Sequence, residues 1–174
     1  MTVIADRFDG KPLCSPNDLV AHPDGSIWFT DPPYGDTLSE GHPDDAGGPT
    51  NADGVLNPRI GGPDAGVIGG KKRELPNSVY RWDPSGRLDV VVTEDQLPDP
   101  NGICFSPDYK TLYVISTGKG LGDTGPGGDG NVFAFDVQGT RLAGMRRFTD
   151  MAVDGVKCDP DGMRADDTAI EILG

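Results

Sequence analysis

The chain has 174 residues, a length that suits one domain, and its formal net charge at pH 7 is −13. This acidic balance argues against a nucleic-acid partner, because binding to phosphates requires a basic surface. It suits a protein that binds cations, although an ordinary soluble acidic surface is the better explanation of the charge alone. The chain contains 26 Gly and 16 Pro, but its apolar residues form short alternating runs, which favours folding over disorder.

The three cysteines are Cys14, Cys104 and Cys158. Their number is odd and none forms a C-x-x-C pair, so we expect neither a disulfide framework nor a zinc knuckle. No apolar run reaches the length of a membrane span, and the first residues lack the features of a signal peptide. We therefore expect a cytoplasmic protein with no membrane partner, or a periplasmic one if the native N-terminus is missing.

Short strands separated by Gly, Pro and Asp dominate the pattern in chain order. Residues 2–8 are interpreted as part of a preceding strand. Strands are then predicted at 18–21 and 26–30 around Pro23-Asp24-Gly25, and at 78–82 and 87–93 around residues 83–86. A second set is predicted at 102–105, 111–115, 131–135 and 141–148, with turns at 106–108 and 137–139. Four antiparallel strands per repeat are typical of a β-propeller blade.

Two long segments interrupt this pattern. Residues 32–77 are rich in Gly, Pro and Asp and show no period. They form either a lid over one face of the fold or a tolerated surface insertion. The stretch TGKGLGDTGPGGDG from Thr117 lacks the order of a phosphate-binding loop, and it is interpreted as a connection within its repeat.

One phrase recurs at the start of each repeat: SPNDLVAHPDGSIWFTDPPYG from Ser15, DPNGICFSPDYKTLYVISTG from Asp99, and DPDGMRADD from Asp159. Internal repeats are typical of stacked architectures. Asn17, Asn101 and Asp161 occupy equivalent positions, so their side-chain oxygens can meet on a central axis. Oxygen ligands suit a hard divalent cation such as calcium. Taken singly, each residue is also an ordinary turn residue.

The repeats predict the organisation of the chain. We assign a blade to residues 17–96 with the insertion 32–77, a second blade to 101–150, and the start of a next blade to 161–174. A second D-G start at Asp154 is less complete than the one at Asp161. Two blades and a fraction cannot close a ring, so we expect a partial propeller that is poorly stable alone, because open edges and apolar faces favour aggregation.

The phrases quoted above, with VYRWDPSG and PDGMRAD, resemble the senescence marker protein (regucalcin), gluconolactonase and luciferin-regenerating enzyme family, most closely its bacterial gluconolactonase-like members. The resemblance implies an all-β, six-bladed propeller of roughly twice this length. It also implies one divalent metal, calcium first, with zinc, manganese and magnesium as alternatives. By motif, Asn17, Asn101 and Asp161 match three metal ligands. The family's fourth ligand is a Glu in a phrase E-G-P-x-W, which this chain does not contain.

The resemblance further implies hydrolysis of a small-molecule sugar lactone. This reaction needs a polarised carbonyl, an activated water and a stabilised oxyanion, and a divalent cation serves the first and third. Asp161 is the only matched ligand that can act as a base, so it is predicted to be catalytic as well as a ligand. Asp18 is a candidate for binding sugar hydroxyls or for orienting Asn17. The missing Glu leaves two alternatives open: a non-catalytic binding propeller, or an inactive fragment that lacks its remaining blades.

Overall fold

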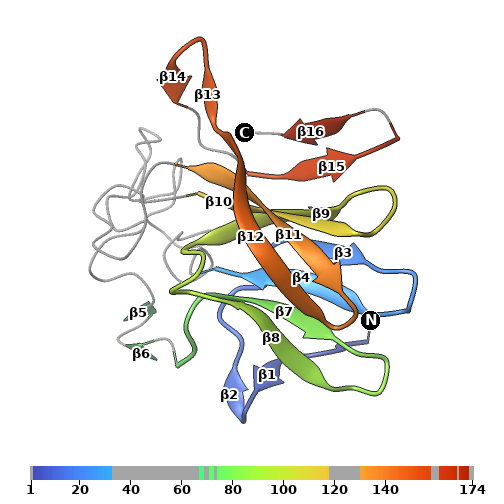
Figure 1. Ribbon diagram of the computed structural model, residues 1–174. Helices are drawn as coiled ribbons and strands as arrows, with labels where there is room; N and C mark the ends of the chain where they lie inside the picture. The colour runs from blue at the N-terminus through green and yellow to red at the C-terminus, as the bar shows by residue number, and fades with distance from the viewer. Residues whose placement is uncertain are drawn as a thin grey trace.

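The computed structural model describes residues 2–32, 67–68, 71–72, 74–117, 130–157, 161–167 and 169–172. Throughout these ranges the regular structure consists of β-strands. The predicted all-β class is therefore confirmed. Nothing in the described ranges is a helix of the length and apolarity that a membrane span requires. Figure 1 shows two four-stranded sheets and a C-terminal hairpin following one another through the molecule.

The first sheet is antiparallel, with the order β3-β4-β7-β8. Its strands are β3 (Leu19–Ala21), β4 (Ile27–Asp31), β7 (Ser78–Trp82) and β8 (Leu88–Thr93). Each lies within one residue of its predicted position. The β3–β4 turn ends at Gly25, whose φ of 86° is a value that glycine adopts without steric cost. The turn residues and the alternation of apolar side chains therefore suffice to locate these strands.

The second sheet is also antiparallel, with the order β12-β11-β10-β9. Its strands are β9 (Pro100–Phe105), β10 (Thr111–Ser116), β11 (Asn131–Gln138) and β12 (Arg141–Asp150). All four are longer than predicted. The turn expected at 137–139 is displaced, because Val137 pairs with Leu142 and Gln138 with Arg141. A two-residue turn starting at Gly139, with φ 65°, then joins the strands.

The strand predicted within residues 2–8 is present but much shorter than expected. Only β1 (Arg7–Phe8) is a strand there, and it pairs with β2 (Lys11–Pro12). Between them Asp9 and Gly10 have φ values of 50° and 78°. Two successive residues with positive φ form the tight turn that matches the twist of a hairpin. The local Asp-Gly pair therefore reverses the chain before a longer strand can form.

Three further small hairpins lie among the described residues: β5 (Val67–Ile68) with β6 (Lys71–Lys72), β13 (Ala152–Val153) with β14 (Val156–Lys157), and β15 (Met163–Ala165) with β16 (Ile170–Ile172). The sequence reading did not predict β13, β14 or β16. Asp154 and Gly155 form the β13–β14 turn with positive φ values, so the second D-G start is a hairpin turn. Most of segment 32–77 and of the Gly-rich stretch lies outside the described residues. The lid or surface insertion at 32–77 and the connection formed by the Gly-rich stretch therefore stay predictions.

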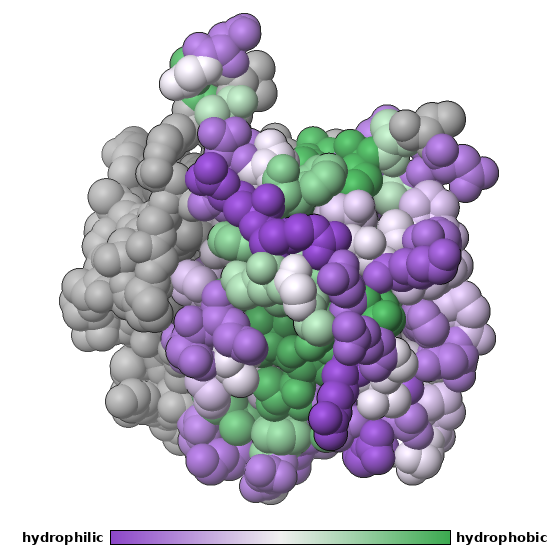
Figure 2. Space-filling view, in the orientation of Figure 1, coloured by the Kyte–Doolittle hydropathy of each residue, from purple (hydrophilic) through white to green (hydrophobic). Residues whose placement is uncertain are grey.

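The core lies between the two sheets and continues to the C-terminal hairpin β15–β16. Trp28 of the first sheet is fully buried and its ring meets that of Phe105 of the second sheet edge-to-face, with centroids 5.5 Å apart. A second cluster joins Cys104 and Ile115 of the second sheet to Met163 of β15. Burial of large apolar side chains holds each layer to the next. Figure 2 shows hydrophobic residues in the middle of one face, framed by hydrophilic ones.

A buried arginine strengthens the first sheet. Arg81 of β7 is 3% exposed, and its guanidinium lies 3.2 Å from Asp24 and 3.0 Å from Asp83. Hydrogen bonds from Ser85 and then from Arg81 lower the pKa of Asp83 to about 2. Loss of either carboxylate would leave part of a buried charge unpaired, which is costly. The turn after β3 is thereby tied to the turn after β7.

Candidate functional site

The first predicted ligand, Asn17, stands immediately before β3 and its side chain is exposed. Its backbone N–H donates to the Thr30 carbonyl oxygen at 3.0 Å. Asp18 exchanges two further bonds with Thr30: its N–H donates to Thr30 Oγ1 at 3.2 Å, and its carbonyl oxygen accepts from Thr30 N at 3.0 Å. The start of β3 is therefore held tightly against the end of β4.

A buried carboxylate holds the chain that leads into Asn17. Asp31 is fully buried at the end of β4. Its Oδ2 accepts the backbone N–H of Cys14 at 3.0 Å, and its Oδ1 accepts that of Ser15 at 2.6 Å. Hydrogen bonds of this kind to an ionised acceptor are strong. The sequence analysis did not identify Asp31. Its partners Cys14 and Ser15 precede it by 17 and 16 positions, and no local pattern indicates such a contact.

The second predicted ligand, Asn101, is buried in β9 with 7% of its surface exposed. Its Nδ2 donates to Thr117 Oγ1 at 3.1 Å. Its Oδ1 is buried and accepts no hydrogen bond from any residue that the structure describes. Leaving such an oxygen without a partner costs about 1–3 kcal/mol, so it calls for an explanation. An amide oxygen in this state is suited to bind a cation.

A second polar pair lies next to Asn101. Asn77 is 2% exposed, and its Nδ2 donates to Asp99 Oδ1 at 2.8 Å. Asp99 has a φ of 45°, and its carbonyl oxygen accepts the N–H of Thr117 at 3.1 Å. This bond fixes the residue whose hydroxyl holds Asn101. Asp99 begins the second repeat phrase, but the sequence analysis did not predict its contact with Asn77, which lies 22 positions earlier.

The third predicted ligand, Asp161, precedes β15 and is exposed. Its backbone oxygen lies so close to Gly102 that a Cβ added at Gly102 would be only 2.4 Å away. Absence of a side chain at Gly102 therefore allows β9 to approach the chain before β15. Gly102 directly follows Asn101, so the second and third repeat starts lie against each other.

Asp18 links all three repeat starts. Its Oδ2 accepts the backbone N–H of Ile103 at 3.1 Å, a contact between residues 85 apart in the sequence. The same oxygen lies 3.6 Å from Arg164 Nη1. The structure thus brings the neighbours of Asn17, Asn101 and Asp161 together. Their service as a ligand set stays a prediction.

No group of three or more His, Cys, Asp or Glu side chains suited to a metal occurs within the described ranges. The predicted ligand set has two Asn side chains and only one carboxylate, that of Asp161. The absence of such a group therefore neither supports nor contradicts the predicted set.

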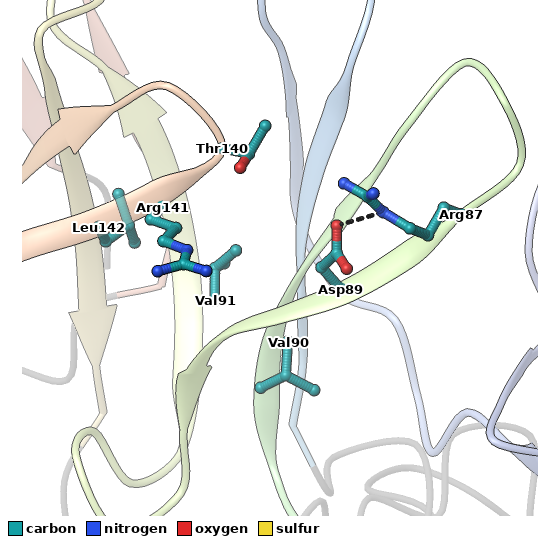
Figure 3. A pocket seen from close by; sticks show the side chains of 7 residues that line it. All are labelled: Arg87, Asp89, Val90, Val91, Thr140, Arg141 and Leu142. Carbon is teal, nitrogen blue, oxygen red and sulfur yellow. Dashed lines mark hydrogen bonds and ion pairs between the residues drawn. The ribbon is translucent and has the colours of Figure 1, made fainter.

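Two hollows are lined by described residues. The smaller, of about 130 Å³, lies beside Asn17 and Asp18 and is otherwise lined by apolar residues: Ile4, Ala5, Leu13, Pro16, Leu19, Ile27 and Phe29. The larger, of about 530 Å³, is a groove between β8 and the start of β12. Figure 3 shows its lining, in which Arg87 pairs with Asp89 at 2.9 Å. The groove contains none of the repeat-start residues, whereas the smaller hollow adjoins the candidate site at Asn17 and Asp18.

Comparison with known proteins agrees with the repeat phrases. Residues 1–169 match the family described as the SMP-30/Gluconolactonase/LRE-like region. A gluconolactonase of Zymomonas mobilis is 31% identical over 171 residues, which cover 95% of this chain and 37% of that protein. A lactonohydrolase of Aspergillus oryzae is 27% identical over 177 residues, covering 91% of this chain and 34% of that protein.

A solved gluconolactonase of Xanthomonas campestris has a TM-score of 0.58 and 33% identity, covering 94% of this chain and 41% of that one. The chain therefore spans between 34% and 41% of the length of these relatives. With a family match that extends over nearly all of its residues, the chain belongs to the SMP-30/gluconolactonase/LRE-like family.

Proposed function

We propose that this protein takes part in the metal-dependent hydrolysis of a sugar lactone. The observation that carries the proposal is the buried Oδ1 of Asn101, which has no hydrogen-bond partner among the described residues and lies next to the place where the three repeat starts meet. The names of the relatives, gluconolactonase and lactonohydrolase, support the reaction class. Because the chain covers well under half of each relative, the proposal concerns the site that these residues contribute to.

Asn17, Asn101 and Asp161 are the residues that would hold the cation. All three offer oxygen, which favours calcium, with zinc, manganese and magnesium as alternatives. A bound cation would supply Lewis acidity toward the lactone carbonyl and the developing oxyanion. Since Asn17 and Asn101 are neutral, they would leave more of the positive charge uncompensated than carboxylates would.

The chain's own residues have separate roles in this proposal. The hydrogen bond from Asn101 Nδ2 to Thr117 uses the donor end of the amide and leaves its oxygen for binding. Asp161 is exposed, so water and substrate can reach its carboxylate. We assign it the proton of the attacking water, which it takes as general base. The apolar hollow beside Asn17 would shield one side of the site from water.

The test is hydrolysis of D-glucono-1,5-lactone, followed with a pH indicator in weak buffer, with and without a chelator. We expect turnover above the spontaneous rate that the chelator removes and calcium restores. Asp161→Ala should abolish turnover, and Asn101→Ala should raise the calcium concentration needed for it. Asp89→Ala, which removes a carboxylate from the distant groove, is the control and should match the unmodified protein. Full activity in Asp161→Ala would rule out the proposed base.

A calcium titration beside this assay separates the alternative of a non-catalytic binding propeller. Calcium binding that depends on Asn101, without lactone turnover, would favour that alternative.

A further inference from the structure

Among the described residues, the carboxylate of Asp18 contacts the starts of all three repeats. We propose that Asp18 is a positioning residue, which fixes the strand starts carrying Asn17, Asn101 and Asp161 relative to one another. The consequence for cation binding rests on the function proposed above. The placement itself rests on the contacts of Asp18 alone.

Asp18 is anchored firmly in the first sheet. Its backbone makes two hydrogen bonds with Thr30 of β4. Its Oδ1 accepts the N–H of the next residue, Leu19, at 2.9 Å. The side chain is only 19% exposed. These contacts restrict the side chain, so its second oxygen can serve as a fixed point for the neighbouring layers.

The second oxygen reaches the second sheet. Asp18 Oδ2 accepts the backbone N–H of Ile103, inside β9 and two residues after Asn101. Ile103 is 1% exposed, so this N–H is removed from bulk water. A hydrogen bond from a buried donor to a charged acceptor contributes more than a neutral one. Moving β9 away from β3 would break it, and it therefore resists any change in the distance between Asn17 and Asn101.

The same oxygen also faces the C-terminal hairpin. Arg164 Nη1 lies 3.6 Å from it, three residues after Asp161. The Arg164 side chain is 70% exposed, so this ion pair alone contributes little. Close packing between Gly102 and Asp161 supplies the firmer contact with that hairpin. Asp18 and Gly102 thus hold the first start to the second and the second to the third.

A residue that only strengthens the fold would affect stability and leave binding unchanged. A positioning residue should alter cation affinity as well, since removal of groups that orient metal ligands costs about 10–100-fold in affinity. Asp24 provides the matched control. Its carboxylate belongs to the turn between two strands of the first sheet. Like that of Asp18, it accepts a backbone N–H, here from Ser26 at 2.8 Å, and pairs with an arginine, Arg81, at 3.2 Å. It lies in the turn at the opposite end of β3 and β4.

The experiment compares Asp18→Ala, Asp18→Asn and Asp24→Ala in the protein. Hydrogen exchange of the Ile103 amide is measured by NMR, and affinity for calcium is measured by titration with calcium chloride. We expect Asp18→Ala to speed exchange of the Ile103 amide by at least about 10-fold and to weaken calcium binding by about 10–100-fold. Asp18→Asn keeps one of the two oxygen acceptors, which can still accept the Ile103 N–H, and should recover part of both losses. Asp24→Ala should lower the melting temperature without changing either quantity.

The outcomes test three statements separately: the placement of Asp18, its positioning role, and the proposed metal-dependent function. Unchanged exchange of the Ile103 amide in Asp18→Ala would overturn the proposed placement, whether or not calcium binds. Equal calcium affinity in Asp18→Ala and the unmodified protein would also overturn the positioning role. If the unmodified protein binds no calcium, the proposed metal-dependent function fails, while faster exchange in Asp18→Ala alone would still support the placement.

Discussion

Replacing Gly102 with alanine tests how closely the second sheet must approach the C-terminal hairpin. A Cβ at this position would lie 2.4 Å from the backbone oxygen of Asp161, 2.9 Å from Ile115 Cδ1 and 3.0 Å from Gly162 Cα. Two of these atoms belong to the backbone, so they cannot rotate away as the end of a side chain can. The variant must therefore displace the chain at Asp161, move β9, or do both.

The size of the displacement follows from the shortest contact. Cβ atoms are essentially never found closer than 3.0 Å to another atom, so the 2.4 Å contact must lengthen by about 0.6 Å. Overpacking of this kind costs about 1–3 kcal/mol. A displacement approaching 1 Å between reacting groups can also reduce the rate by about 100-fold. We expect Gly102→Ala to lose about 1–3 kcal/mol of unfolding free energy and 10- to 100-fold or so in lactone turnover.

Gly162→Ala is the matched control, because it changes the same type of residue beside Asp161. A Cβ on Gly162 would meet no atom within 4 Å, and its φ lies outside the left-handed region. Where the backbone permits alanine, this substitution stabilises by about 0.4–1 kcal/mol through the unfolded chain. Urea denaturation followed by tryptophan fluorescence would compare the two variants. If Gly102→Ala unfolds at the same urea concentration as Gly162→Ala, the close packing of β9 against Asp161 is refuted.

Three further predictions concern Asp83, Cys104 and Asp31. Hydrogen bonds from Ser85 and Arg81 lower the pKa of Asp83 from 3.8 to about 2, so their stabilising effect is complete above about pH 4 and is lost as the pH falls toward 2. In urea denaturation, the stability difference between the unmodified protein and Asp83→Asn should shrink over that range, and a constant difference would contradict the reasoning. Burial raises the pKa of the Cys104 thiol to about 12, so native Cys104 should resist iodoacetamide at pH values where the unfolded chain reacts; rapid labelling of the native protein, measured by peptide mass spectrometry, would disprove this. Asp31→Asn leaves one buried backbone N–H without its acceptor and should cost about 1–3 kcal/mol in urea denaturation, whereas a loss below about 0.5 kcal/mol would show that water replaces the carboxylate.

The strands of both sheets could be predicted because their signals are local. Alternating apolar residues and turns such as Pro23-Asp24-Gly25 specify a hairpin from within a dozen residues. The same local rules, applied too coarsely, missed the hairpins at Asp9-Gly10 and Asp154-Gly155, where two residues with positive φ reverse the chain between strands of only two residues. Propensity alone cannot decide whether such short segments pair.

The candidate site was also predicted only in part from the sequence. Repetition of one phrase located Asn17, Asn101 and Asp161, because equivalent positions of repeats occupy equivalent places in a fold. Repetition could not show that Asn101 is buried, or that its Oδ1 accepts no hydrogen bond from the part of the chain that the structure describes, since both depend on which residues pack around it.

The sequence by itself determined the order of the strands along the chain, the positions at which the repeat phrases begin and the residue types at each start. These features depend only on neighbours along the chain. Only the tertiary structure decided that Asp18 binds the N–H of Ile103, 85 residues away, and that Gly102 leaves room for the backbone of Asp161. Contacts of that range arise only after the sheets have packed, when burial of residues such as Trp28 and Met163 brings separate layers to within hydrogen-bonding distance.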